Sequence, residues 1–215
     1  DMINAIVITQ KQNCLPDYDK IHHYFEKLLS CTGTNNSTDK QWSFCIFDAI
    51  VEHTGPNSIK YAPIFLNHIV TGLNAEIDEI RQATATTIGK IAKACSDYNI
   101  VNSVYDQALQ QAVIELKKTI DEGIQRKLED DEEPEDIENH EFDGEIWESS
   151  VSALGKIMRY KNDILSWEVG FDPWLDLLVQ AKGFNNDAEE AIATFQWFND
   201  LMENNMNFLN QNHSC

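Results

Sequence analysis

The chain has 215 residues, 42% of them hydrophobic, and a formal net charge of −20 at pH 7. This hydrophobic content is enough for a packed core, and no run of about eighteen apolar residues is present that would cross a bilayer. The charge predicts repulsion from nucleic acid and anionic membranes, and attraction toward basic partners. We therefore expect a soluble, non-secreted protein that binds neither nucleic acid nor membrane.

Cysteine usage and the first residues add two expectations. The five cysteines are odd in number, scattered and without a C-x-x-C pair, which predicts reduced thiols in a cytosolic or nuclear compartment. Residue 1 is Asp1, and Met2 to Thr9 begins without a helix cap. We expect a piece cut from a longer protein.

Apolar periodicity predicts an all-α chain. Asp39 and Ser58 are the predicted N-caps of two helices, and Pro63 is expected either to bend its helix or to start a second segment. The predicted helices lie at about 2–12, 17–31, 39–55, 59–73, 78–94, 98–120, 144–160, 167–178 and 188–204.

The helix predicted over 78–94 carries an apolar stripe made mostly of small residues. Ala83, Thr84, Ala85 and Gly89 lie within it, and small residues allow a neighbouring helix backbone to approach closely. The composition of this helix therefore indicates helix packing more than chemistry.

The same helix is repeated along the chain. Ile88-Gly89-Lys90-Ile91 returns 66 positions later as Leu154-Gly155-Lys156-Ile157. Related segments, Phe47-Asp48-Ala49-Ile50 and Phe198-Asn199-Asp200-Leu201, lie 41 positions before the first copy and 44 after the second. Helix-pair repeats have periods of about 40–47 residues. The spacing predicts a HEAT-repeat α-solenoid, a superhelix of antiparallel helix pairs.

An acidic segment interrupts the repeats. Fourteen acids and two bases lie between Asp121 and Glu148, and Pro134 forbids a continuous helix. We expect repeats over 1–120, an acidic loop over 121–144, and repeats over 145–215 that end in a loose tail. The loop is a solvated segment, a contact for basic partners, or a cation site. Its candidate contact residues are Glu129, Asp130, Asp131, Glu132, Glu133, Glu135, Asp136 and Glu138.

Four segments together resemble consecutive C-terminal repeats of the karyopherin-β (importin-β) family of nuclear import receptors, in its importin beta-three branch. They are DKQWSFCIFDAIVEHTGPNSIKYAPIFLNHI (39–69), DEIRQATATTIGKIA (78–92), WESSVSALGKIMRYKNDI (147–164) and EEAIATFQWFNDLMENN (189–205). The resemblance covers nearly the whole chain from about Leu15. The acidic insertion is longer and more charged than the family pattern at this joint.

This resemblance implies a receptor that shuttles between cytoplasm and nucleus. Such a receptor binds protein cargo with basic localisation signals, contacts nucleoporins, and releases its cargo when it binds the GTP-bound Ran GTPase, which binds mainly N-terminal repeats absent here. The alternative is a HEAT scaffold for protein–protein interaction unrelated to transport.

The resemblance also implies that the second helix of each pair lines a concave surface. Stacking the copies by register aligns three rows of positions, which we expect to face partners or solvent. We expect that replacing Lys90 and Lys156 together weakens the binding of a partner protein without changing the unfolding of the chain. The candidate residues are Glu52, Thr86, Lys90, Lys93, Ser152, Lys156, Arg159, Gln196, Asp200 and Glu203.

Other conspicuous residues have structural as well as functional interpretations. Trp197 is expected in the core, Trp42 and Trp147 are either core residues or binding anchors, and Arg81 is expected to pair with an acid such as Asp78. His22-His23 has no spaced metal-ligand partner, and no catalytic or phosphate-binding motif is present. We expect no cofactor, no metal and no enzymatic activity.

Overall fold

The computed structural model describes residues 2–31, 37–130, 144–161, 163–164 and 188–204. The described ranges contain helices and turns but no strand, so the expected all-α class is confirmed. No helix among them is long and apolar enough to cross a membrane. The helix predicted over 167–178 and the tail from 205 lie outside these residues. The helices are α1 (Met2–Gln10), α2 (Leu15–Ser30), α3 (Ser37–His53), α4 (Ala62–Gly72), α5 (Asp78–Asp97), α6 (Ser103–Asp130), α7 (Gly144–Tyr160) and α9 (Ala188–Asn204).

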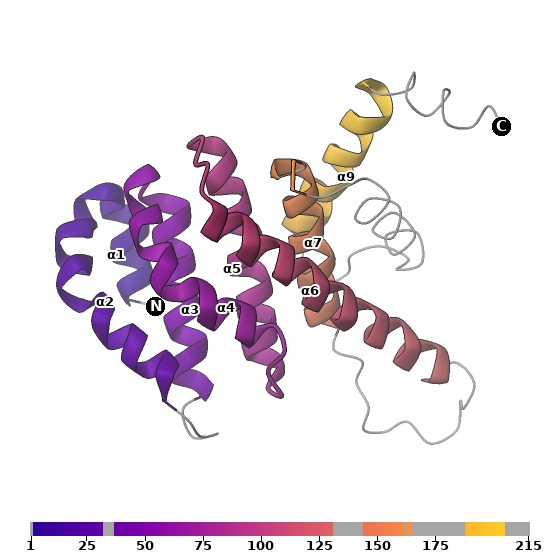
Figure 1. Ribbon diagram of the computed structural model, residues 1–215, viewed down its shortest axis with the longest axis horizontal. Coiled ribbons are helices and arrows are strands. Elements are labelled where there is room, and N and C mark those ends of the chain that lie inside the picture. The colour runs from indigo at the N-terminus through magenta and orange to yellow at the C-terminus, as the bar shows by residue number, and fades with distance from the viewer. Residues whose placement is uncertain (1, 32–36, 131–143, 162, 165–187, 205–215) are drawn as a thin grey trace.

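The helices form two layers (Figure 1). In the first layer α1, α3, α5, α7 and α9 lie next to one another in that order, and in the second layer α4 packs between α2 and α6. Consecutive helices also pack across the layers, as α2 does on α3, α4 on α5 and α6 on α7. Each of α3, α5 and α7 therefore contacts the first-layer helix before it and the first-layer helix after it.

The turn after α3 explains why the helix predicted over 59–73 is divided. Gly55 has φ of +77°, a conformation that favours glycine, and a 3-10 helix, Pro56–Tyr61, follows it. Pro63 lies in the first turn of α4. It therefore starts a second helical segment instead of bending one long helix, which is one of the two outcomes expected from the sequence.

The structure does not place either predicted N-cap residue, Asp39 or Ser58, at a helix N-cap. Asp39 lies inside the first turn of α3, which begins at Ser37, and its carbonyl oxygen accepts a hydrogen bond from the hydroxyl of Ser43. Ser58 lies within the 3-10 helix, where its buried hydroxyl donates to the carbonyl of Gly55.

α5 is packed on both sides by first-layer helices, α3 and α7. A Cβ atom added at Gly89 would lie 3.2 Å from the Cα atom of Ala153, so the backbones of α5 and α7 approach closely there. Next to α5, the rings of Phe47 and Phe65 stack at 4.1 Å and join α3 to the second layer. The small stripe of α5 thus allows close helix packing, as its sequence predicts.

The helix before the acidic segment extends further than expected. α6 continues to Asp130, so the first ten residues of the predicted loop over 121–144 are helical. Glu, Lys, Arg and Gln are good helix formers, and acidic charge does not end a helix as Pro does. The segment 131–143 lies outside the described residues.

Candidate partner-binding face

The candidate residues lie on the four adjacent helices α3, α5, α7 and α9. Because these helices neighbour one another, each predicted row crosses the first layer from α3 to α9. Glu52, Lys93, Arg159, Gln196 and Asp200 are exposed, while Thr86, Lys90 and Lys156 are half-buried. Ser152 is buried, with 5% of its surface exposed, so its hydroxyl is not on an open surface. Glu203 belongs to α9, but its side chain is outside the described residues, as are those of Glu129 and Asp130 at the end of α6.

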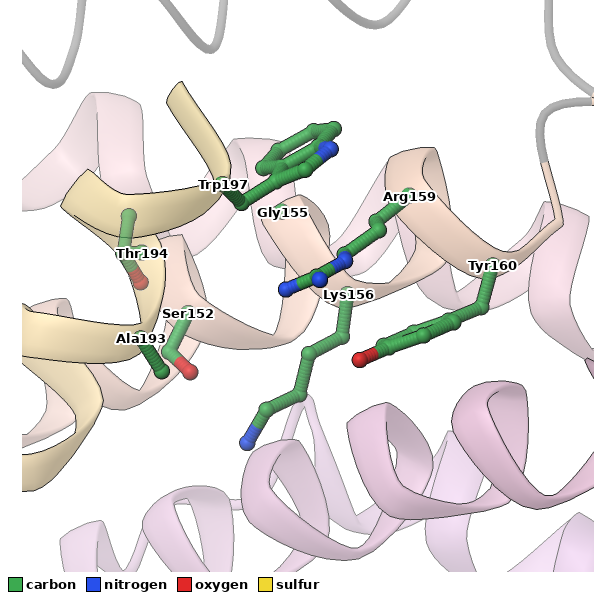
Figure 2. Close-up of a pocket in the computed structure, with 8 residues that line it drawn as sticks. All are labelled: Ser152, Gly155, Lys156, Arg159, Tyr160, Ala193, Thr194 and Trp197. Atoms are coloured by element: carbon green, nitrogen blue, oxygen red, sulfur yellow. The ribbon is translucent and has the colours of Figure 1, made fainter. Parts of the chain in front are cut away.

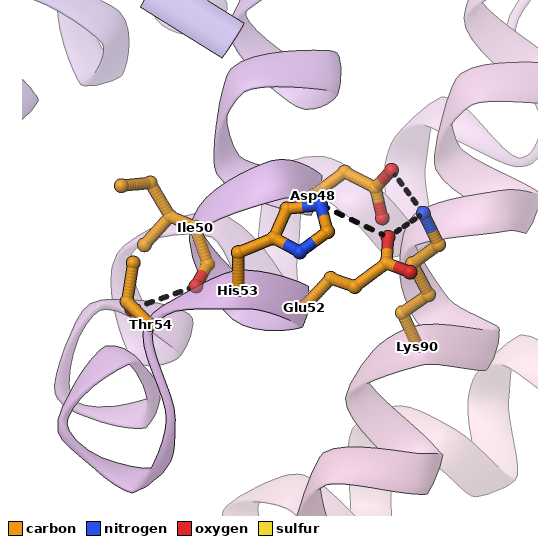
Figure 3. A network of polar contacts seen from close by, with 6 residues as sticks. All are labelled: Asp48, Ile50, Glu52, His53, Thr54 and Lys90. Atoms are coloured by element: carbon orange, nitrogen blue, oxygen red, sulfur yellow. Dashed lines mark hydrogen bonds and ion pairs between the residues drawn. The ribbon is translucent and has the colours of Figure 1, made fainter. Parts of the chain in front are cut away.

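Lys90 is the centre of an ion-pair network between α3 and α5 (Figure 3). Its ammonium nitrogen lies 2.7 Å from Oδ2 of Asp48 and 2.6 Å from Oε2 of Glu52. The ring of His53 lies 3.9 Å from the same Glu52 oxygen. One lysine therefore fixes α5 to two carboxylates of the preceding first-layer helix.

Asp48 is a residue that the sequence comparison missed. Stacking the copies aligns Lys90 with Ala49, so the acid one position earlier was left out of the rows. The available signal is the pair of acids at i and i+4, Asp48 and Glu52, which lie on one face of α3.

Desolvation and charge act in opposite directions in this network. Burial raises the pKa of the Asp48 carboxyl, and the Lys90 ammonium offsets only part of that shift. Desolvation would raise the pKa of Glu52, but the hydrogen bond and charge of Lys90 outweigh it and lower that pKa. Desolvation would lower the pKa of Lys90, but Asp48 and Glu52 outweigh it, so the pKa is raised and the lysine stays charged.

These contacts change the expectation for the substitution of Lys90 and Lys156. Only 23% of the Lys90 side chain and 16% of the Asp48 side chain are exposed, so removing the lysine leaves a poorly solvated carboxylate. We now expect substitution of Lys90 to lower stability. Any loss of partner binding must therefore be corrected for unfolding.

A small cleft lies between α7 and α9. Figure 2 shows the side chains of Lys156, Arg159 and Tyr160 on α7, and Thr194 and Trp197 on α9. The guanidinium carbon of Arg159 lies 5.2 Å from the ring centroid of Tyr160. Three candidate residues, Ser152, Lys156 and Arg159, thus line one cleft.

The remaining sequence interpretations concern packing. Trp197 is buried as expected and Trp147 is buried too, whereas 42% of the Trp42 surface is exposed. Arg81 forms the predicted ion pair with Asp78 and also donates to the carbonyl of Ala75.

Among the residues that the structure describes, no group of three His, Cys, Asp or Glu side chains could hold a metal ion. No protein-family model matches this sequence.

Proposed function

We propose that the chain is a segment of a HEAT-repeat α-solenoid that binds proteins and belongs to a nuclear transport receptor of the karyopherin-β type. The proposal rests on the sequence resemblance and on the order of the helices. Two layers in which each helix contacts its equivalent in the next copy are what stacked helix pairs require.

One observation carries the repeat assignment. Segments aligned by sequence spacing alone lie side by side in space: Lys90 reaches Glu52, 38 residues earlier and three positions after its aligned residue Ala49, and Gly89 lies against Ala153, two positions before its aligned residue Gly155. Periodicity in the sequence and neighbourhood in the fold agree, which supports stacked repeats over an unrelated helical bundle.

In this proposal the chain works by binding and has no catalytic role. Its net charge of −20 favours cargo with basic localisation signals, and the acidic segment over 129–138 is the strongest local attractor for them. Nucleoporins are the second class of partner, and the Ran GTPase acts mainly through repeats outside this chain. The receptor shuttles between cytoplasm and nucleus through the pore.

Binding to nucleoporins separates this proposal from a scaffold of another kind. Purified nucleoporin domains are immobilised on a biosensor, with an unrelated acidic protein on the reference surface, and the chain is passed over both. We expect reversible binding to the nucleoporin surface alone. No binding at micromolar chain concentrations, or equal binding to both surfaces, would favour a HEAT scaffold unrelated to transport.

A further inference from the structure

Lys156 of α7 extends over α5 toward the polar network of α3. A Cβ atom added at Gly89 would lie 3.0 Å from Cδ of Lys156, so the stem of the lysine crosses α5 at the position of that glycine. In Figure 2 this stem points away from Trp197 and toward the neighbouring helix. A side chain at position 89 would obstruct the lysine, so glycine there allows a base of α7 to extend over α5.

The charge of Lys156 acts on both acids of that network. Burial raises the pKa of the Asp48 carboxyl, and Lys90 and, more weakly, Lys156 oppose the rise. Burial would also raise the pKa of Glu52, but Lys90 and, more weakly, Lys156 lower it. Two acids of α3 therefore share one base of α5 and one base of α7, and the four formal charges cancel.

The two carboxylates can accept more hydrogen bonds than Lys90 supplies. Lys90 donates to Oδ2 of Asp48 and to Oε2 of Glu52. Oδ1 of Asp48 is buried and accepts no hydrogen bond from the residues that the structure describes. A further cationic donor is favoured there, because an unpaired buried acceptor costs free energy and hydrogen bonds between charged groups are strong. Since 47% of the Glu52 side chain is exposed, such a donor can approach from outside the chain.

We propose that Lys156 is an internal competitor for basic partners, occupying the place beside Glu52 and Asp48 that a lysine or arginine of a partner protein would otherwise take. The inference rests on the proposed binding of basic cargo, and it adds a second contact site to the one in the acidic segment. The net charge of −20 attracts basic side chains to the surface on which these two acids lie. A partner that binds them must displace Lys156, which releases α7 from the acids of α3.

The test measures the affinity of a fluorescein-labelled peptide of three lysines separated by glycines. K156M removes the competing charge and keeps an unbranched stem over Gly89, and K156Q replaces it if K156M does not fold. K27M is the control of equal net charge, because Lys27 is exposed on α2, in the other layer, and its ammonium lies 5.9 Å from the ring centroid of Tyr24. E52Q and E52Q/K156M test the acid. Circular dichroism establishes that each variant folds.

We expect K156M to bind the peptide about fivefold more tightly than K27M, because both lose one positive charge and only K156M vacates the acids. In the E52Q background the gain from K156M should fall to about twofold or less. Equal affinities of K156M and K27M, an undiminished gain in the E52Q background, or no binding by K156M would overturn the inference. Nucleoporin binding is a separate measurement, so its loss contradicts the transport role and not this internal contact.

Discussion

Lys90 lies 2.7 Å from Asp48, a residue 42 positions earlier in the sequence and on the preceding helix of the same layer. The same ammonium group lies 2.6 Å from Glu52. A contact between positions 42 residues apart is expected where similar helices stack in chain order, and it gives the polar face of α3 and α5 a fixed register.

Replacing Lys90 by methionine should lower the free energy of unfolding by about 1–3 kcal/mol, because the largely buried Asp48 then lacks its counterion. E52Q should cost less than about 1 kcal/mol, since 47% of the Glu52 side chain is exposed. Urea denaturation followed by circular dichroism measures both. Adding D48N to K90M should restore part of the loss, and strictly additive losses would contradict the pairing.

Replacing Gly89 by alanine should destabilise the chain although alanine is the better helix former. The new Cβ would lie 3.0 Å from Cδ of Lys156 and 3.2 Å from the backbone of Ala153, so α5 and α7 must separate slightly. We expect the free energy of unfolding to fall by about 1–2 kcal/mol, because the cost of overpacking outweighs a gain in helix propensity of about 1 kcal/mol. S96A, at an exposed position of the same helix, is the control in thermal unfolding. A higher melting temperature for G89A would contradict the close approach.

Mild acid should reduce stability through His68. Burial lowers the pKa of its ring below the ordinary 6.5, Glu26 opposes this shift and Lys40 adds to it. The unfolded chain therefore takes up the proton first as pH falls, and the stability present above pH 6.5 is lost below it. H68Q should show a smaller drop in urea midpoint between about pH 7.5 and about pH 5.5. The same drop in H68Q and the unmodified chain would contradict this assignment.

Cys31 should react with iodoacetamide long before Cys95. Cys31 is exposed, whereas Cys95 is buried and burial raises its pKa to about 11, the Lys161 charge opposing the shift. At about pH 8 its thiolate fraction is then at least about 100-fold below that of an ordinary thiol. Peptide mapping by mass spectrometry after timed alkylation follows both sites. Similar rates in the folded chain would show that Cys95 is not held in the core.

The spacing of residues close together in the sequence predicted several features of the structure correctly. The small residues around Gly89 indicate a close helix neighbour, and the last copy was expected at 188–204, where α9 lies. The pairing of Arg81 with Asp78 also follows from spacing, since residues three apart on a helix are neighbours. These features depend on few residues and need no knowledge of distant contacts.

Features that depend on side-chain reach or on competing signals were not predictable in this way. Asp48 lies one position before Ala49, the residue aligned with Lys90. The length of the Lys90 side chain is what brings its ammonium group to the Asp48 carboxylate. α6 was expected to end at Ile120 because acids accumulate there, yet Ile124 and Leu128 continue its four-residue spacing to Asp130. Burial of Ser152 depends on how closely α7 is packed by its neighbours, which the sequence of α7 alone does not specify.

The acidic segment is best tested by substitution, because deletion of 121–144 would remove the end of α6. One variant, D131N/E132Q/E133Q/E135Q, neutralises four of its acids. The control, D17N/E26Q/E76Q/E79Q, neutralises four exposed acids elsewhere. Both change the net charge equally, so long-range attraction falls equally and only a local contact distinguishes them.

The deciding measurement is the affinity of a fluorescent basic localisation peptide for these chains at about 50 mM and about 200 mM salt. We predict binding that weakens with salt, and a loss of about fivefold or more in the segment variant but not in the control. Equal losses in both variants would contradict a cargo contact in the segment. No binding to the unmodified chain at either salt concentration would contradict the role of this chain in cargo recognition.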